Sequence, residues 1–412
     1  MPIALTGAGV GGLTAALSLP AAGQGDILLL EAAREIRDVG VGINLPPHAV
    51  RELSELGLGD ALAKVGVPTK ELAYYDPRGQ LIWAEPRGLD AGYKWPQYSI
   101  HRGTLQRLLV DAVHERLGAS TIRVAQRVTG ISATGNKAAI AATDLIEDRP
   151  VSYTADVAIC ADGIRSPSRD SLYGAVTPLA SNGWVMYRGV TKAGPFLSGR
   201  SMVIIGDETQ RGVVYPIADG VINWLLVRPK DTTRAETELG NWNLPVPTSV
   251  IAEFVKDYRF DWLDVHHLVS SSSESYEYPM ADIDPLPRWI FGRCALLGDA
   301  AHAMYPFGSN GASQAILDAR VLAYELATAA TTDDALRAYD AQRRPVASEV
   351  QLANRRQAGD VMARVSALAR SGAHGDAKAE LQDVERRYKQ LAGFDVDALN
   401  MRKSWSVSSA SR

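Results

Sequence analysis

The chain of 412 residues lacks several features that would each point to a particular class of protein. Its only two cysteines, Cys160 and Cys294, lie in apolar runs typical of buried strands, so a disulfide framework is not expected. It has no polybasic block, and 43 Lys and Arg against 47 Asp and Glu give a net charge of -4, which argues against nucleic acid or an anionic membrane as a partner. The uncharged start has no basic residues before its apolar part and is broken by glycines. We therefore expect neither export nor a membrane span, and a cytoplasmic location.

Metal-ligand patterns are missing as well. His266 and His267 have no further Cys, His or Glu at ligand spacing, so no metal site is predicted. What is present is a composition of 46% hydrophobic and 22% charged residues, typical of a soluble globular protein of two or three domains. This composition favours an enzyme that acts on a small molecule.

The order of strand and helix patterns predicts an α/β fold in which a Rossmann-like nucleotide-binding domain is interleaved with an antiparallel sheet domain. Five of the eight tryptophans lie in the expected sheet domain. After Pro345 we expect one or two charged helices to about Leu391, and a Ser-rich tail that frays from Ser404. The predicted division is residues 1–71, 100–178 and 290–350 for the nucleotide-binding domain, 72–99 and 179–289 for the sheet domain, and 351–412 for the C-terminal helices and tail.

A glycine motif lies between the first predicted strand and the first predicted helix. Gly7-Ala-Gly9-Val-Gly-Gly12 fits G-x-G-x-x-G, and Glu31 closes the next strand 19 residues after Gly12. Gly7 allows a tight turn, Gly9 lets a pyrophosphate approach the backbone, and Gly12 lets helix and strand pack closely. The helix N-terminus offers N–H groups to the anion, and Glu31, with the neighbouring Ala32, is expected at the adenosine ribose. The motif alone does not separate FAD from NAD.

Two further segments place an aspartate at the end of a buried strand. They are Cys160-Ala-Asp162-Gly163-Ile-Arg165-Ser and Gly298-Asp299-Ala-Ala-His302-Ala-Met-Tyr-Pro306. A carboxylate in that place can accept hydrogen bonds from ribityl hydroxyls. No second G-x-G-x-x-G follows a strand, so one tightly held dinucleotide is expected.

Together these motifs resemble the single-component FAD-dependent aromatic hydroxylases, the family of 4-hydroxybenzoate and salicylate hydroxylases, from residue 3 to about residue 350. The resemblance implies the 4-hydroxybenzoate hydroxylase-like fold, FAD as cofactor, and NADH or NADPH as co-substrate. It implies that the Asp162-Gly163 pair touches FAD and the nicotinamide, that Gly298-Asp299 binds the ribityl chain, and that Arg102 lies near the pyrophosphate. Beyond the glycine motif, the implied cofactor residues are Gly42, Arg102, Asp162, Gly163, Arg165, Gly298 and Asp299.

Within the family, the chain looks most like the pyocyanin-forming phenazine hydroxylases. Departures fall where a ligand would lie: Leu45-Pro-Pro-His48, Tyr187 in place of Trp, and Phe307 in the turn after Pro306. The flavin chemistry is therefore implied and the particular substrate is open. The segments that carry the likeness are Gly40-Val-Gly-Ile-Asn44, Tyr98-Ser-Ile-His-Arg102, Tyr187-Arg-Gly-Val190 and Met304-Tyr-Pro-Phe-Gly308.

The implied reaction is hydroxylation, with or without loss of a carboxylate, of an electron-rich aromatic or N-heteroaromatic small molecule. In this family NAD(P)H reduces FAD, O2 adds at flavin C4a, and the ring attacks the resulting hydroperoxide. Such a species needs a dry cavity, which the tryptophan-rich sheet can provide. No catalytic side chain is assigned. Pro306 and Gly308 are expected near the flavin, and backbone N–H groups of Gly308, Asn310 and Gly311 favour negative charge on the reduced ring.

The substrate wall is expected to come from large side chains of the sheet domain and of the turn after Pro306. For each of them, ordinary core packing is an equally good interpretation. His48 can hydrogen-bond a substrate, although a helix-surface histidine is the simpler interpretation. Arg188 and Arg211 can pair with a substrate carboxylate, although solvated surface positions are favoured. The candidates are Tyr187, Tyr215, Trp224, Met280, Phe307 and His48.

Three alternatives stay open from the sequence. A nicotinamide-dependent dehydrogenase would use the glycine motif alone and would leave both aspartate motifs unexplained. A flavoprotein could instead bind a planar aromatic molecule without turnover, and a flavin oxidase or reductase could use the same fold. The expected partners are an aromatic substrate and O2, in a monomer or a homodimer.

Overall fold

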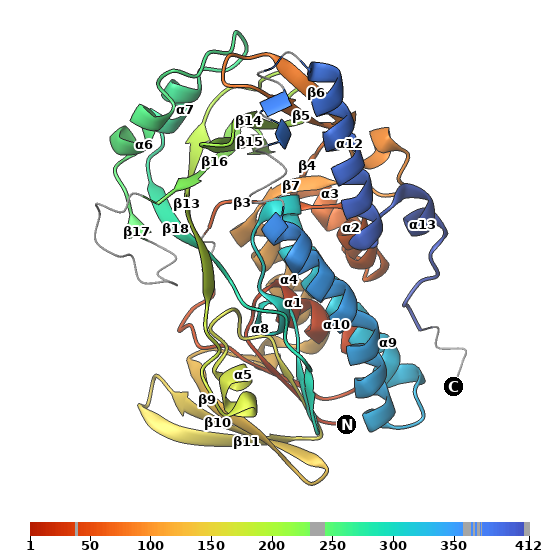
Figure 1. Ribbon diagram of the computed structural model, residues 1–412. Coiled ribbons are helices and arrows are strands. Elements are labelled where there is room, and N and C mark those ends of the chain that lie inside the picture. The colour runs from red at the N-terminus through yellow and green to blue at the C-terminus, as the bar shows by residue number, and fades with distance from the viewer. Residues whose placement is uncertain are drawn as a thin grey trace.

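The computed structural model describes residues 1–37, 40–230, 244–356, 364–365, 367–368, 371 and 373–407. Their secondary structure forms one mainly parallel and one mainly antiparallel large sheet, with long helices along one side of the molecule (Figure 1). Within these ranges, every helix is too short or too polar to cross a bilayer.

The mainly parallel sheet has six strands in the order β19-β20-β12-β1-β2-β8, and only the β19–β20 pair is antiparallel. Strands β1 and β12 are buried along their whole length, as apolar strands covered on both faces should be. The strands are β1 (Ile3–Thr6), β2 (Ile27–Leu30), β8 (Ile122–Arg123), β12 (Val157–Cys160), β19 (Ile290–Phe291) and β20 (Cys294–Leu296).

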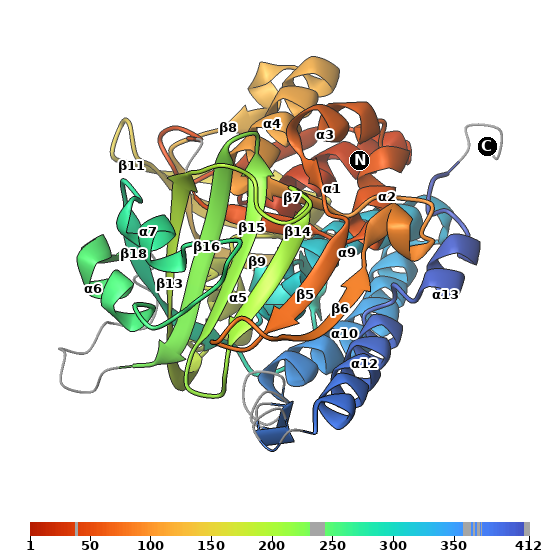
Figure 2. The same ribbon diagram turned by 90° about the horizontal axis from the view of Figure 1, so that it is seen from above.

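The second large sheet has eight strands in the order β17-β18-β13-β16-β15-β14-β5-β6, and all neighbours are antiparallel except β14 and β5. Helices α6 and α7 pack on one face, called here the back face, and α12 packs on part of the opposite front face (Figure 2). The elements are β5 (Glu71–Tyr75), β6 (Leu81–Pro86), β13 (Ala180–Lys192), β14 (Ser201–Gly206), β15 (Arg211–Ala218), β16 (Val221–Pro229), β17 (Leu244–Pro245), β18 (Ser275–Asp282), α6 (Thr248–Phe254), α7 (Val265–Ser270) and α12 (His374–Leu391).

Two smaller sheets and the remaining helices complete the fold. Strands β11-β10-β9 form one sheet, and β3-β7-β4 form another that contacts β15 of the large antiparallel sheet. The strands are β3 (Gly42–Leu45), β4 (Val67–Pro68), β7 (Tyr98–His101), β9 (Gln126–Thr134), β10 (Lys137–Asp144) and β11 (Arg149–Ala155). The helices are α1 (Val10–Ala21), α2 (Pro47–Glu55), α3 (Gly59–Val65), α4 (Arg102–Leu117), α5 (Pro167–Tyr173), α8 (Asp299–His302), α9 (Gly311–Thr328), α10 (Thr332–Arg356) and α13 (Val396–Met401), with short 3-10 turns at η1 (Gly88–Ala91), η2 (Ala119–Thr121) and η3 (Phe307–Ser309).

The predicted α/β class and the interleaving of the two large sheets are present in the structure, while the domain boundaries stay a prediction. One helix differs from the expectation: α10 begins at Thr332 and passes through Pro345 instead of starting after it. A proline inside a helix removes one backbone hydrogen bond. Buried residues on both sides of it, among them Tyr339 and Val350, keep the helix continuous through packing that the sequence does not reveal.

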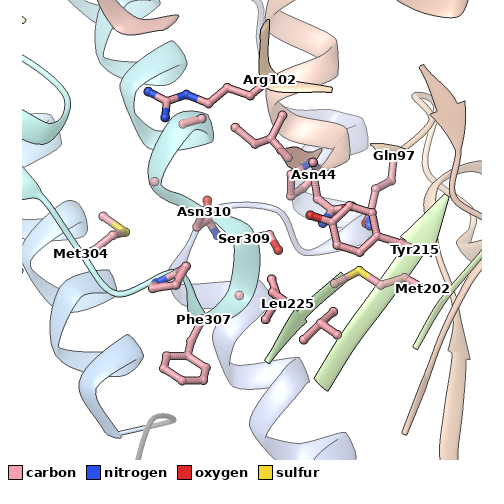
Figure 3. A pocket seen from close by; sticks show the side chains of 18 of the residues that line it. Asn44, Gln97, Arg102, Met202, Tyr215, Leu225, Met304, Phe307, Ser309 and Asn310 are labelled. Atoms are coloured by element: carbon pink, nitrogen blue, oxygen red, sulfur yellow. The ribbon is translucent and has the colours of Figure 1, made fainter. Parts of the chain in front are cut away.

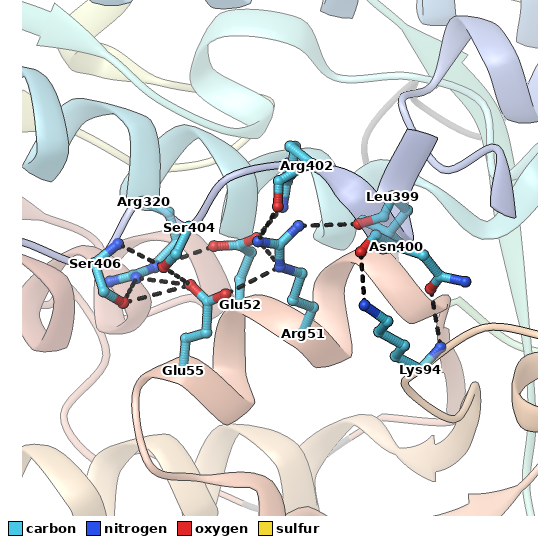
Figure 4. A network of polar contacts seen from close by, with 10 residues as sticks. All are labelled: Arg51, Glu52, Glu55, Lys94, Arg320, Leu399, Asn400, Arg402, Ser404 and Ser406. Carbon is cyan, nitrogen blue, oxygen red and sulfur yellow. Dashed lines mark hydrogen bonds and ion pairs between the residues drawn. The ribbon is translucent and has the colours of Figure 1, made fainter. Parts of the chain in front are cut away.

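The C-terminal segment is held where fraying was expected. Ser404 Oγ lies 2.6 Å from Glu55 Oε2, and Ser406 Oγ accepts a hydrogen bond from Arg320 at 2.9 Å. Arg402 pairs with the buried Glu52 of α2 (Figure 4). Carboxylates on a distant helix thus anchor residues that look like a flexible tail in sequence. Residues 408–412 lie outside the described part of the chain.

Candidate active site

The glycine motif forms the turn between β1 and α1. Gly7 has a φ of +92°, and a Cβ there would lie 2.4 Å from the Ala161 carbonyl oxygen. A Cβ on Gly12 would lie 2.0 Å from the Gly7 carbonyl oxygen. At Gly9, by contrast, no described atom beyond its chain neighbours lies within 4 Å of the Cβ position, and this residue lines a cavity. The turn therefore leaves room for an anion at the start of α1, where no described side chain caps the helix.

Glu31 ties the end of β2 to this turn. Its two carboxylate oxygens each accept a backbone N–H at 2.7 Å, one of them from Ala8. The neighbouring Ala32 is exposed. Gln106 on α4 donates to the Ala8 carbonyl oxygen at 2.7 Å. Sequence analysis missed this contact, because no pattern distinguishes this glutamine from any other glutamine in a helix. Arg102, the first residue of α4, is exposed and lines the same cavity.

The first aspartate motif lies where β12 ends. Asp162 accepts hydrogen bonds from the Ser166 hydroxyl and from the Ser168 N–H, so its carboxylate holds the start of α5. Burial raises the pKa of Asp162. Gly163 has a φ of +84° and lines the cavity, while Arg165 is exposed. This strand end thus offers backbone, more than the aspartate side chain, to the cavity.

The second aspartate motif lies where β20 ends, and it depends on a buried residue of α9. Gly298 donates its N–H to Asp318 Oδ2 at 3.0 Å, and His302 Nε2 lies 2.6 Å from the same oxygen. Arg343 donates to Asp318 Oδ1 at 2.8 Å. Burial opposes the charge of Asp318, but His302 and Arg343 hold its pKa below the usual value. Asp299 is exposed and lines the cavity.

Asp318 was missed by sequence analysis. A carboxylate on the apolar side of a predicted helix was the signal that could have found it, because such a group needs buried partners.

The loop before α9 lines the same cavity as the glycine turn. Pro306 and Gly308 are exposed and line the cavity together with Asn310 and Gly311. Gly308 has a φ of +72°, and a Cβ on it would lie 2.3 Å from the Tyr388 ring, so this position needs glycine. Helix α9 begins at Gly311, and no described side chain caps its N-terminus. The loop therefore presents an open helix N-terminus to the cavity.

His48 lies neither on the surface nor in the cavity. It is fully buried on α2, its Nε2 lies 3.0 Å from Asn310 Oδ1, and its ring stacks on Phe394 with centroids 4.6 Å apart. Burial lowers the pKa of His48 to about 3, so the imidazole is neutral at neutral pH. The structure thus gives His48 contacts with Asn310 of the loop before α9 and with Phe394, which both line the cavity, while His48 itself does not.

These elements surround a cavity of about 480 Å³. The front face of the antiparallel sheet forms its floor, and the glycine turn and the loop before α9 lie across from it. Figure 3 shows Tyr215, Met202 and Leu225 on the sheet side and Ser309 and Asn310 on the loop side. The front-face residues that line it are Met186, Arg188, Met202, Ile204, Arg211, Val213, Tyr215, Leu225 and Val227.

Strand alternation decides which predicted substrate residues reach this cavity. Tyr215 and Phe307 line it. Tyr187 and Trp224 do not, because they lie at back-face positions, where the Tyr187 ring is 5.7 Å from the Phe254 ring. Met280 is buried beside the floor residues Met186 and Val227 and does not itself line the cavity.

Helix α12 supplies a side wall that sequence analysis did not include in the site. It belongs to the C-terminal segment and was assigned no contact with a ligand. Its apolar positions at helical spacing were a signal, but the surface they face follows only from the tertiary structure. The residues of α12 that line the cavity are Leu381, Val384, Glu385 and Tyr388.

Two of the cavity arginines are bonded to groups of the chain itself. Arg87 Nη2 lies 2.8 Å from Glu85 Oε1 and 3.1 Å from Glu385 Oε2, so two carboxylates balance its charge. Arg188 donates to the Gly42 carbonyl oxygen at 2.8 Å. Burial lowers the pKa of Arg188. The solvated position favoured for Arg188 from the sequence is therefore wrong, because the sheet packs it beneath β3.

The residues present fit a flavin dinucleotide. The open Cβ position at Gly9 and the uncapped N-termini of α1 and α9 offer backbone N–H groups to anionic parts of a ligand. Gly163 and Asp299 line the same cavity as the glycine turn and the loop before α9. An elongated ligand that contacts both helix N-termini is the shape that this arrangement accepts.

Known proteins are similar to this chain in sequence and in fold. A family model described as an FAD binding domain matches residues 1–353. The chain is 44% identical to phenazine 1,6-dicarboxylic acid hydroxylase of Lysobacter antibioticus, over 86% of this chain and 89% of that protein. It is 31% identical to 3-hydroxybenzoate 6-hydroxylase 1 of Aquipseudomonas alcaligenes, over 86% of this chain and 87% of the other. The structure of Klebsiella pneumoniae HpxO with FAD and uric acid superposes with a TM-score of 0.78, at 24% identity, covering 95% of this chain and 96% of that one.

These matches confirm the predicted family, fold class and cofactor. They also confirm the likeness to phenazine hydroxylases, as a similarity in sequence. The alternative of a dehydrogenase that uses the glycine motif alone is thereby excluded. The chain belongs to the FAD-dependent aromatic hydroxylases, flavoprotein monooxygenases that use NAD(P)H.

Proposed function

We propose that the chain hydroxylates a planar, fused-ring N-heteroaromatic carboxylic acid of the phenazine class. The observation that carries this proposal is the floor of the cavity, where Met186, Val213, Leu225 and Val227 form a broad apolar surface opposite the loop before α9. Flat rings pack well on such a surface. The similarity to a phenazine 1,6-dicarboxylic acid hydroxylase supports the same class.

The overall reaction balances as one aromatic C–H, one NAD(P)H, one proton and one O2 giving one aromatic C–OH, one NAD(P)+ and one water. When a carboxylate is replaced, CO2 leaves in place of the ring hydrogen and a second proton is consumed. FAD, when bound, supplies the hydride acceptance and the oxygen activation. The chain's residues bind the two ring systems, orient them and exclude water. No side chain is assigned as acid or base.

The cofactor roles are assigned to the elements that line or support the cavity. Gly7, Gly9 and Gly12 hold the pyrophosphate at the start of α1. The backbone N–H groups at the start of α9 favour negative charge on the reduced flavin ring. For the substrate we keep Tyr215 and Phe307, which line the cavity, and leave out the four candidates that do not. The full cofactor set is Gly7, Gly9, Gly12, Glu31, Ala32, Gly42, Arg102, Asp162, Gly163, Arg165, Gly298, Asp299, Pro306, Gly308, Asn310 and Gly311.

The further partners follow from the same reaction. We infer O2 and NADH or NADPH as co-substrates, a monomer or homodimer as the assembly, and a cytoplasmic location.

The test uses the purified FAD-loaded protein. Phenazine-1-carboxylate and phenazine-1,6-dicarboxylate are compared with salicylate, 3-hydroxybenzoate and urate, and NAD(P)H oxidation, H2O2 and 18O incorporation from 18O2 are measured together. Phenazine acids are expected to stimulate NAD(P)H oxidation most and to gain one labelled oxygen atom. Stimulation with all electrons recovered as H2O2, or labelled product from a single-ring acid only, would overturn the proposal.

A further inference from the structure

Asn310 directly precedes the first residue of α9, yet it does not cap this helix. Asparagine is among the residues that most often close a helix N-terminus, because its side-chain oxygen can accept an N–H of the second or third helical residue. Asn310 instead has a ψ of -12°, outside the extended range that capping uses, and its side chain makes no capping bond. The first N–H groups of α9 are thus left without a side-chain cap beside the cavity, which Asn310, Gly311 and Ala312 line (Figure 3).

Two buried donors occupy the side-chain oxygen of Asn310. His48 Nε2 on α2 lies 3.0 Å from Asn310 Oδ1, and Gln314 Nε2 donates to the same oxygen at 3.0 Å. All three side chains are fully buried. An amide oxygen accepts two hydrogen bonds through its two lone pairs. With both positions filled, Asn310 Oδ1 has none left for an N–H of α9.

The far end of this network fixes which atoms donate. Arg343 Nη2 donates to Gln314 Oε1 at 2.6 Å, so the amide nitrogen of Gln314 faces Asn310 and needs an oxygen there. His48 must then donate to that oxygen, which requires a proton on its Nε2. His48 Nδ1 is buried and has no hydrogen-bond partner among the residues that the structure describes, as suits the ring nitrogen without a proton.

The C-terminal segment holds both donors in place. Phe394 stacks on the His48 ring, with 4.6 Å between the centroids and 6° between the ring planes. Gln314 Nε2 also donates to the Ala392 carbonyl oxygen at 3.3 Å. Tyr93 in turn donates its hydroxyl to the Phe394 carbonyl oxygen at 2.7 Å. The orientation of Asn310 therefore depends on packing by residues far from it in sequence.

We propose that His48 is a positioning residue for the flavin: its hydrogen bond to Asn310 keeps the start of α9 uncapped, so that the N–H groups there stabilise the negative charge of the reduced ring. Without this donor, Asn310 Oδ1 can turn and accept an N–H of Ala312 or Ser313. A capped terminus offers less positive potential to an anion. The inference rests on the placement of the reduced ring at α9 in the proposed function, and it does not depend on which aromatic substrate is used.

The experiment measures the two-electron midpoint potential of the bound FAD and the dissociation constant of oxidised FAD, both without aromatic substrate. His48→Phe removes the donor and keeps a ring that can stack on Phe394, while His48→Gln keeps an N–H donor. Asn310→Ala removes the side chain that can cap and keeps the backbone. Tyr93→Phe is the matched control, because it removes a buried hydrogen bond to the C-terminal segment and leaves the His48–Asn310 pair intact. Thermal unfolding and FAD content are recorded for each variant.

His48→Phe is expected to weaken the binding of reduced FAD about tenfold more than that of oxidised FAD. For a two-electron couple this lowers the midpoint potential by about 30 mV. His48→Gln should restore most of the wild-type potential, and Tyr93→Phe should lower thermal stability without changing the potential. In the Asn310→Ala background, His48→Phe should have no further effect, because no side chain is left to cap α9. An unchanged potential in His48→Phe, or an equal shift when Asn310 is alanine, would overturn the assignment.

Turnover of phenazine acids separates this result from the proposed function. If no phenazine acid is hydroxylated but His48→Phe lowers the potential only when Asn310 is present, the phenazine proposal fails and the positioning role stands. If phenazine acids are hydroxylated and His48→Phe keeps the wild-type potential, the positioning role fails and the proposed function stands.

Discussion

The two faces of the large antiparallel sheet use similar residues for different purposes. On the back face, Tyr187 and Trp224 are buried under α6 and α7, and Trp224 Nε1 donates to the Ser272 hydroxyl inside the protein. On the front face, Tyr215 and Arg211 border a cavity. Both faces carry aromatic rings and a guanidinium packed on a ring, so composition does not distinguish them.

The difference comes from alternation along each strand. Leu225 lines the cavity and Leu226, the next residue, is 2% exposed within the back-face core. Because successive side chains of a strand point to opposite faces, one step in sequence moves a residue from ligand contact to core packing. Substitutions at neighbouring positions should therefore separate stability from binding.

The largest effect is expected from Trp224→Ala on the back face. The indole is 1% exposed and lies over Gly189, where a Cβ would be 2.4 Å from the ring. Removing it should lower the free energy of unfolding by about 3–5 kcal/mol. Urea denaturation measures this loss, and the folded fraction should bind aromatic ligand with wild-type affinity. If the fully folded Trp224→Ala variant bound the aromatic ligand more weakly than the wild type, Trp224 would belong to the binding site.

Tryptophan substitutions at Leu225 and at Leu226, made separately, should have smaller effects that differ more clearly between stability and ligand affinity. Leu226→Trp overfills a packed core and should cost about 1–3 kcal/mol of unfolding free energy with ligand affinity retained. Leu225→Trp projects into the cavity, so we expect little change in stability and a roughly tenfold or greater loss of aromatic ligand affinity. Denaturation and flavin-difference titration are run on both. The reverse pattern would show that the assignment of faces is inverted.

The smallest effect is expected from Ser272→Ala. Its hydroxyl accepts from Trp224 Nε1 at 2.7 Å, while Thr191 Oγ1 stays available at 3.2 Å. The loss of unfolding free energy should therefore be about 1 kcal/mol, with ligand affinity unchanged. The matched front-face change is Tyr215→Phe, which should alter ligand affinity more than stability. Equal effects of the two changes on affinity would argue against separate roles for the faces.

Much of the cofactor half was predictable because backbone geometry restricts the residue types there. A Cβ at Gly7 or Gly12 would overlap backbone atoms, so these glycines are visible in sequence as a motif. Gly298 and Gly163 follow buried strands in the same way. The supporting residues were less visible. Asp318 and Gln106 contact the motifs through hydrogen bonds of their side chains. Other residue types can make such hydrogen bonds, so no sequence motif identifies these two positions.

The substrate half was predictable as a sheet with a large apolar face, but not residue by residue. Tyr187 and Trp224 were chosen for their size, and size alone does not reveal which face a strand buries. His48 was expected at a helix surface, yet Phe394 from a segment more than 300 residues later stacks on it. The cavity wall formed by α12 was missed for a similar reason: the apolar face of a helix can be predicted from sequence, but the surface on which it packs cannot.

The amino-acid sequence by itself determined the flavin-binding turn, the α/β class and the family, because these depend on local backbone constraints that only a few residue types satisfy. Only the tertiary structure decided which side chains border the cavity. Those positions depend on strand register, on which face of each strand is covered, and on the docking of C-terminal helices far away in the chain. Arg211, for which the sequence favours a solvated position, is instead buried between the rings of Trp184 and Phe307 from separate segments, as a product of that packing.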